Sequence, residues 1–373
     1  MQSVYINHIA KYLPGLPIHN EEMEEYLGLI SGKKSKSKSI ILRNNGITSR
    51  YYAIEKDGTL LETNAEMTAK AIQHLGIALD RVSYLSAGTP LPDQILPAHA
   101  NMVHGIIGGN NLEVSSHGGS CLSGFHALKS AFLHVKSELH SHAIATGSEL
   151  WSKNFRNENF EEEAAKLREL EQQPIIAFEA DFLRWMLSDG AAAVHLSNKP
   201  NPELSLRIDW MESKSFAHEL ETCMYLGGEK EGKKLIGFRA FEPKLWPEKS
   251  LFAIKQDTKI LGNYIISKGL EYTREIAQKH QLDPKEIDWL LPHISSMYFF
   301  DKMLKGYEEI GFAIPVEKWF TNLKTVGNLG SAAFMFILEE LFHSGKLKKG
   351  QKILVMIPES ARFAYGYIHL TVV

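Results

Sequence analysis

The chain has 373 residues, of which 44% are hydrophobic and 23% charged, and its formal net charge is −3. This composition is typical of a globular protein that buries one large core or two of medium size. The charge gives no indication of nucleic-acid binding, and no apolar run approaches the roughly 20 residues of a membrane span. The first residues lack the pattern of a signal peptide, and two cysteines make no disulfide framework, so we expect a cytoplasmic protein.

Short apolar segments alternate with helical patterns, which indicates an α/β fold. Early in the chain, strands are expected at residues 82–87, 143–147 and 191–196. Between the first two, residues 118–124 surround Cys121 with small side chains and lead into apolar positions at helical spacing. The thiol is therefore expected at a helix start, where the helix dipole and free N–H groups favour the thiolate. A small buried core cysteine is the alternative.

The middle of the chain is interrupted by Asn and Pro residues at 198–202, which predict a boundary there. We expect residues 1–200 to form an N-terminal half and residues 201–373 a C-terminal half. Two charged stretches stand apart from this pattern. Residues 33–38 predict a solvated loop, and a glutamate-rich run predicts an exposed helix inside an insertion at residues 151–180.

The second half repeats the order of elements of the first. Strands are expected at residues 287–291 and 352–357, and a turn at 327–330 lies between them and opens a helix. The separations, about 40 and then about 25 residues, resemble those of the first half, as an internal repeat would give. Residues 331–338 are almost entirely apolar, so this helix should be buried against its counterpart after Cys121.

Three residues suited to acyl-thioester chemistry lie at the expected strand ends and helix starts: Cys121, His293 and Asn328. A thiol can form an acyl-enzyme when a neighbouring imidazole or dipole activates it. An Asn amide can donate a hydrogen bond to a developing oxyanion or enolate. Taken singly, His293 is read as a core or capping histidine and Asn328 as a turn residue. Their joint placement on the two repeated halves favours a catalytic role.

The chain resembles the thiolase-superfamily condensing enzymes, and within them the β-ketoacyl-acyl-carrier-protein synthase III group. Six motifs carry the resemblance, in the order of that family: NGITSR at 45–50, GGSCLSG at 118–124, TGSE at 146–149, SDGAAA at 188–193, LPH at 291–293 and GNLGSAA at 327–333. The resemblance implies a thiolase fold, with five layers in the order α-β-α-β-α, two pseudo-symmetric halves and a homodimer. It requires no metal or redox cofactor, since the substrates arrive as phosphopantetheine thioesters.

By this resemblance Cys121 carries the acyl group, while His293 and Asn328 stabilise an enolate. The Cys121 N–H is one donor of the expected oxyanion hole, and a second is expected near Ser360 and Ala361, where the family has a Gly-rich turn. The residues that clamp coenzyme A in the family are also replaced. An acyl carrier protein is therefore the expected donor and partner. The basic residues 33–38 and 346–352 are candidate docking sites for it, and plain solvated loops are an equal alternative for both stretches.

A closer resemblance is to the DarB-type ketosynthases. It rests on YLP at 12–14, NEEME at 20–24, ILRNNGI at 41–47, RYYA at 50–53 and FLRWMLSDG at 182–190. That subgroup joins a β-ketoacyl thioester and a second acyl thioester to a 2,5-dialkylcyclohexane-1,3-dione, the precursor of dialkylresorcinols. Such a substrate must lose a proton, which requires a base. Glu149, Glu179 and His293 are the candidates, although a structural carboxylate after a strand is the slightly preferred interpretation of Glu149.

Other classes fit less well. The decarboxylative synthase III reaction with a malonyl thioester is the main alternative, and a non-catalytic partner subunit of the same fold is a minor one. A papain-like protease shares the order Cys, His, Asn but needs an upstream Gln that is missing here. The histidines at 117, 126, 134, 140 and 142 lack a recognisable metal-ligand spacing, and no GxGxxG motif follows the first strand.

Overall fold

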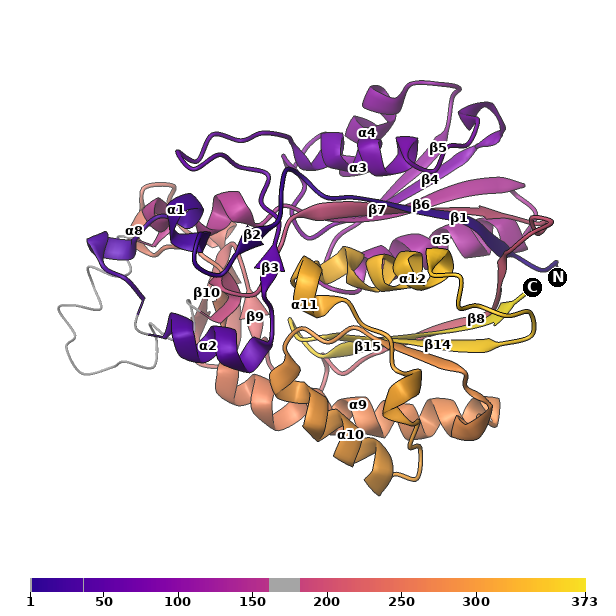
Figure 1. The fold of residues 1–373 in the computed structure, drawn as a ribbon. Helices are drawn as coiled ribbons and strands as arrows, with labels where there is room; N and C mark the ends of the chain where they lie inside the picture. Colours follow the sequence, from indigo (N-terminus) through magenta and orange to yellow (C-terminus); the bar gives the residue numbers. More distant parts are fainter. Residues whose placement is uncertain (1, 36, 161–181) are drawn as a thin grey trace.

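The computed structural model describes residues 2–35, 37–160 and 182–373, which fold into alternating layers of helices and sheet (Figure 1). The strands are β1 Tyr5–Tyr12, β2 Ile18–His19, β3 Ser49–Arg50, β4 Tyr84–Gly88, β5 Glu113–His117, β6 His142–Glu149, β7 Gly190–Ser197, β8 Leu206–Ser215, β9 Met224–Tyr225, β10 Gly228–Glu231, β11 Lys234–Gly237, β12 Lys255–Gln256, β13 Trp289–Pro292, β14 Lys352–Glu359 and β15 Ala364–Val372. The helices are α1 Met23–Leu27, α2 Lys38–Asn45, α3 Asn64–Gln73, α4 His99–Ile107, α5 Ser123–Lys136, α8 Leu245–Glu248, α9 Thr258–His280, α10 Phe300–Glu309, α11 Leu323–Val326 and α12 Ala333–His343.

One mixed sheet contains nine strands in the order β13-β14-β15-β8-β1-β7-β6-β4-β5. β1 and β8 share only two residue pairs, Tyr5 with Arg207 and Ile6 with Leu206. The sheet divides at this short junction into two layers that lie one above the other (Figure 1). The space between the layers therefore belongs to both halves of the chain.

The two halves repeat one strand pattern. β4 is parallel to β6, which is antiparallel to β7, and β7 is antiparallel to β1. In the same way β13 is parallel to β14, which is antiparallel to β15, and β15 is antiparallel to β8. The duplicated α/β architecture expected from the sequence is thus confirmed, and β6 is the counterpart of β14. The expected boundary after residue 200 lies between β7 and β8 and stays a prediction.

The central layer consists of α5 and α12, while α3 and α4 cover one outer face and α9 and α10 the other (Figure 1). α5 buries an apolar stripe that includes Phe125, Leu128 and Phe132. Residues 333–338 of α12 are all buried. A helix enclosed by two sheets has no solvent face, so it must be apolar all round. The prediction that both helices are buried is confirmed.

Two expectations about charged segments have different outcomes. The expectation of a solvated loop at residues 33–38 is wrong at the last residue, because Lys38 begins α2. Its ammonium group lies 2.9 Å from the Glu24 carboxylate and 5.2 Å from the centre of the Trp185 ring, and these contacts order the segment. Of the expected insertion, residues 151–160 form short 3-10 turns with Phe155 and Phe160 buried. The glutamate-rich run after them lies outside the described residues.

In the part of the chain that the structure describes, no helix is both long enough and apolar enough to cross a membrane.

Candidate active site

The residues expected to carry the chemistry meet in one pocket of about 50 Å³, which Cys121, Glu149, His293 and Asn328 all line. Cys121 lies in the turn before α5, and Glu149 is the last residue of β6. His293 directly follows β13, and Asn328 lies between α11 and α12. Strand ends and helix starts from both halves therefore converge on one point, as in other α/β proteins.

The Cys121 turn is held by backbone contacts. Ser123 N–H and the Ser123 hydroxyl both donate to the Ser120 carbonyl oxygen, at 2.9 and 2.8 Å. Gly119 has a φ of 128°, a backbone conformation that other residues rarely adopt. Leu122 N–H donates to Glu359 Oε2 at 3.1 Å, across 237 positions of the chain. The sulfur itself has the Ser120 hydroxyl within 3.8 Å.

The expectation that the helix start favours the Cys121 thiolate is corrected by the structure. Burial raises the pKa of the thiol well above its ordinary value of 9.0, and the carboxyl groups of Glu359 and Glu149 raise it further. Burial removes the water that stabilises a charged sulfur, and this destabilises the thiolate more than the helix terminus stabilises it. The Cys121 sulfur is therefore a neutral thiol at pH 7.

His293 is a neutral imidazole. It is 2% exposed, and its burial lowers its pKa to about 4. Its backbone N–H donates to the Met356 carbonyl oxygen at 2.8 Å, which fixes the residue at the end of β13 next to β14. A neutral imidazole keeps one N–H that can donate to an oxyanion without first releasing a positive charge into the pocket.

Asn328 is fixed by its own turn. Its side-chain Oδ1 accepts from Gly330 N–H at 2.9 Å, and its backbone N–H donates to the Met186 carbonyl oxygen at 2.9 Å. Among the described residues, none of the hydrogen bonds uses the Nδ2 amide of Asn328. That amide lies at the pocket wall and can donate to an oxygen of a bound substrate.

Glu149 is buried, and each of its carboxylate oxygens has a partner. Ser331 N–H donates to Oε1 and the Trp151 indole N–H to Oε2, both at 2.5 Å. Burial raises the pKa of Glu149 to about 8 in spite of these hydrogen bonds. A carboxyl group with such a pKa can accept a proton near neutral pH and can also serve as a structural acceptor. Both alternatives considered from the sequence therefore stay open.

Two further residues were expected at the site, Glu179 and Ala361. Glu179 lies outside the described residues. Ala361 does not line the pocket, although its neighbour Ser360 does. The Ala361 carbonyl oxygen accepts from Cys223 N–H at 2.9 Å and from Met224 N–H at 3.1 Å. The second donor of the oxyanion hole stays a prediction.

Glu359 was not expected from the sequence. It is the last residue of β14 and contacts the Cys121 turn through Leu122. The internal repeat contains the only signal that could have indicated it, because Glu149 ends β6, the counterpart of β14. The two glutamates thus occupy equivalent positions, and each binds the turn before the other half's central helix.

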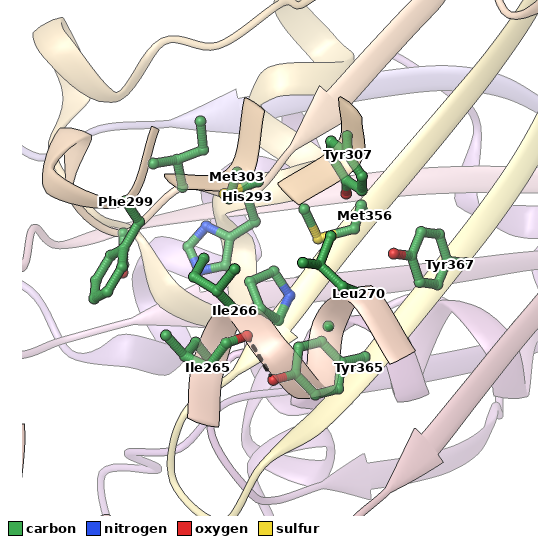
Figure 2. Close-up of a pocket in the computed structure, with 14 residues that line it drawn as sticks. Ile265, Ile266, Leu270, His293, Phe299, Met303, Tyr307, Met356, Tyr365 and Tyr367 are labelled. Atoms are coloured by element: carbon green, nitrogen blue, oxygen red, sulfur yellow. Dashed lines mark hydrogen bonds between the residues drawn. The ribbon is translucent and has the colours of Figure 1, made fainter. Parts of the chain in front are cut away.

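A second pocket of about 40 Å³ begins at His293 and extends between β14, β15 and the helices α9 and α10 (Figure 2). Figure 2 shows His293 at one side of it and Tyr307 and Tyr367 at the other. Among the described residues that line this pocket, none is Asp, Glu, Lys or Arg. Tyr365 satisfies its hydroxyl by donating to the Ile265 carbonyl oxygen at 2.8 Å, so the wall presents mainly apolar surface. Ile265 and His293 line both pockets, which therefore meet beside the imidazole.

Metal ligation was not expected from the histidine spacing. Among the described residues, Glu113, His134 and His140 lie close enough to share an ion. His140 already contacts the Glu113 carboxylate at 2.8 Å and the Ser83 hydroxyl at 2.8 Å, while His134 stacks on Tyr84. These contacts account for the cluster without an ion.

Comparison with known proteins finds similar sequences and similar structures. Residues 277–357 match the family model described as 3-oxoacyl-(acyl-carrier-protein) synthase III C terminal. The chain is 23% identical to beta-ketoacyl-(acyl-carrier-protein) synthase III of Clostridium perfringens over 365 residues, which cover 95% of each chain. A tetronic acid condensing enzyme has a similar structure, with a TM-score of 0.77, 17% identity and 99% of each chain covered.

OleA of Xanthomonas campestris, in a variant solved with bound lauric acid and lauroyl-CoA, is similar with a TM-score of 0.74, 17% identity and 99% of each chain covered. At such low identity these two structures show the fold alone. The fold is that of the thiolase-type condensing enzymes.

Proposed function

We propose that this chain, an acyl-transferring condensing enzyme similar to 3-oxoacyl-(acyl-carrier-protein) synthase III, joins two acyl thioesters through an acyl-enzyme on Cys121. The observation that carries the proposal is the convergence of Cys121, His293 and Asn328 on one pocket. A nucleophile, a neutral imidazole and an amide donor are the groups that a Claisen-type condensation requires.

The first step is acyl transfer to the thiol. Cys121 loses its proton, and the sulfur attacks the carbonyl carbon of the first thioester. The new carbon–sulfur bond forms as the bond to the carrier sulfur breaks, and the carrier leaves as a thiol with that proton. The Cys121 N–H is the proposed donor to the oxyanion, and we propose that the second donor comes from the neighbourhood of Ala361.

The second step forms the carbon–carbon bond. A β-ketoacyl thioester gives up a proton from the carbon between its two carbonyl groups. His293 and the Asn328 amide donate hydrogen bonds to the resulting enolate oxygen. With an α,β-unsaturated acyl group on Cys121, the carbanion adds to the acyl β-carbon. The carbon on the far side of the ketone then loses a proton and attacks the acyl carbon, which closes the six-membered ring and releases the cysteine sulfur as a thiol. Hydrolysis of the remaining thioester frees the carrier, and the resulting β-keto acid loses CO2. We propose Glu149 as the base, supported by its place in the pocket and its pKa of about 8.

The proposed product is a 2,5-dialkylcyclohexane-1,3-dione, a dialkylresorcinol precursor. The two pockets that meet at His293 support this choice, because such a product carries two alkyl chains. The second candidate is the decarboxylative synthase III reaction, in which a malonyl thioester loses CO2 and needs no base. The synthase III names of the curated relatives favour it.

Incubating the enzyme with an α,β-unsaturated acyl donor and either partner thioester distinguishes the two reactions. We expect the cyclohexanedione from the β-ketoacyl thioester and no CO2 from the malonyl thioester. Release of CO2 together with a β-keto product would overturn the choice. As a matched control, Cys121→Ala should form no acyl-enzyme by intact mass in either mixture.

We propose an acyl carrier protein as the donor and a homodimer as the working form, in the cytoplasm. Exposed Lys33, Lys34 and Arg43 precede or lie on α2, which packs against the turn at Met297–Phe299 after His293. The stretch at residues 346–352 follows the opposite end of α12, so the α2 side is the better docking site. Carrier-bound donors should react faster than the same acyl groups on coenzyme A. β5 is the outer strand of the sheet, and its open edge can pair with a second copy.

A further inference from the structure

The two glutamates that end β6 and β14 each bind a turn in the other half of the chain. Glu149 of the first half accepts the Ser331 N–H before α12, and Glu359 of the second half accepts the Leu122 N–H before α5. Carboxylates are well suited to the free N–H groups at a helix start. The two turns differ in their chemistry, because only the turn at Leu122 also carries a nucleophile.

Glu359 contacts this turn without a compensating positive charge. None of the ion pairs among the described residues includes Glu359, and burial raises its pKa while the N–H groups of Leu122 and Ser120 lower it. Its Oε2 would lie 3.9 Å from a Cβ at Gly119, on the other side of Cys121. The carboxylate therefore lies against the backbone on both sides of the nucleophile.

The titratable groups around Cys121 come from three strands. Glu359 ends β14, Glu149 ends β6, and His293 follows β13. His293 is neutral at pH 7 and adds no positive charge. Glu359 disfavours the thiolate more strongly than Glu149 does. Of the two carboxyl groups that raise the pKa of the thiol, the one with the larger effect is thus the one that also binds its turn through Leu122 N–H.

We propose that Glu359 is a positioning residue for Cys121: its carboxylate fixes the nucleophile turn through Leu122 N–H, and its negative charge favours the thiol over the thiolate. The nucleophile is thereby protected from electrophiles and oxidants, which react with thiolates. The proposal rests on the assignment of Cys121 as the nucleophile. It does not depend on the carbanion donor or on the product.

The test measures the rate of Cys121 alkylation by iodoacetamide against pH, read from the mass of the peptide that contains this residue. Glu359→Gln keeps an acceptor for Leu122 N–H and removes the charge. We expect the midpoint of its alkylation profile to fall by at least about one pH unit, the usual effect of a close charge. Exposed Glu275 pairs with Lys214 on the surface of α9, so Glu275→Gln is a charge-matched control that should keep the wild-type midpoint.

A wild-type midpoint in Glu359→Gln would overturn the proposal, since a purely structural role predicts a change in thermal stability alone. If Glu359→Gln does not fold, Glu359→Asp and Glu359→Ala replace it. The Asp variant should keep the high midpoint and the Ala variant should lose it, and equal midpoints would contradict the proposal. Cys223 is buried, with its sulfur 3.3 Å from the Asp257 carbonyl oxygen, and it is counted on a separate peptide. Alkylation needs no acyl substrate. The alkylation profile can therefore contradict the role of Glu359 without contradicting the proposed condensation, and the condensation assay can contradict the proposed reaction without contradicting the role of Glu359.

Discussion

At the scale of single residues, the proposed mechanism gives Cys121 the acyl group and assigns His293 and Asn328 to the enolate of the second substrate. Both line the pocket as neutral donors, and neither contacts the Cys121 turn through a hydrogen bond among the described residues. Acyl transfer and condensation should therefore depend on different side chains.

His293→Ala should keep acylation of Cys121 while the condensation rate falls by about 10²–10³-fold, the usual cost of one oxyanion donor. Intact mass reports acylation, and product formation reports condensation. Because the pKa of His293 is about 4, the protonation of this residue should add no pH dependence of its own to the wild-type rate between pH 5 and 8. Equal loss of both steps in the variant would show that His293 also activates the thiol.

The proposed base gives a pH dependence of its own. Glu149 accepts a proton only when it is ionised, and its pKa is raised to about 8. The single-turnover rate of condensation with a β-ketoacyl thioester should rise about tenfold per pH unit below 8 and level off above it. Glu149→Gln should abolish this rise. The same slope in the variant would assign the base elsewhere.

The sequence motifs identified Cys121, His293 and Asn328 because each has a local pattern at a strand end or helix start. They could not identify Glu359, whose partner Leu122 lies in the other half of the chain. They also indicated the wrong ionisation state for Cys121, since the helix start is visible in the sequence but the two nearby carboxyl groups are not.

At the scale of elements, the central layer depends on glycine. A Cβ at Gly124 of α5 would lie 2.2 Å from the Ser331 carbonyl oxygen, and one at Gly147 of β6 would lie 2.8 Å from the same atom. Glycine at these positions lets the first half approach the turn at Gly330–Ala332 before α12. The positions of Cys121 and Asn328 are set by this close approach.

Gly124→Ala should lower the free energy of unfolding by about 1–3 kcal/mol, the usual cost of overpacking. It should also slow acylation, because the Cys121 turn must shift. Gly262 in α9 has open space where its Cβ would be, so Gly262→Ala is the matched control and should be neutral or slightly stabilising. Urea denaturation and an acylation time course measure the two effects. Equal stability of both variants would contradict this account.

Helices and strands were predicted well where a single physical rule determines their sequence pattern. Residues 331–338 are almost entirely apolar because a helix between two sheets has no wet face, and the strands that were expected at 143–147 and 352–357 are observed as β6 and β14. Lys38 was misassigned because its partners Glu24 and Trp185 are distant in the chain. A charge pattern alone does not show such contacts.

At the scale of the whole molecule, the halves share the central layer, one sheet and two exchanged carboxylates. We expect a single cooperative transition in urea, with tryptophan fluorescence and far-UV circular dichroism coinciding. Trp151 and Trp185 report on the first half, and Trp289 on the second. Two separated transitions would show that the halves unfold independently.

The exchange of glutamates sets a rule for recombining this chain with its relatives. A chimaera that joins residues 1–200 of this protein to the second half of another inherits the Leu122 turn without the carboxylate that binds it, unless the donor also ends that strand in glutamate. The reverse chimaera leaves Glu359 facing a foreign turn. A crossover between the two halves therefore separates Glu359 from the Leu122 turn that it binds. A viable hybrid must take Glu359 and the cysteine turn from the same parent.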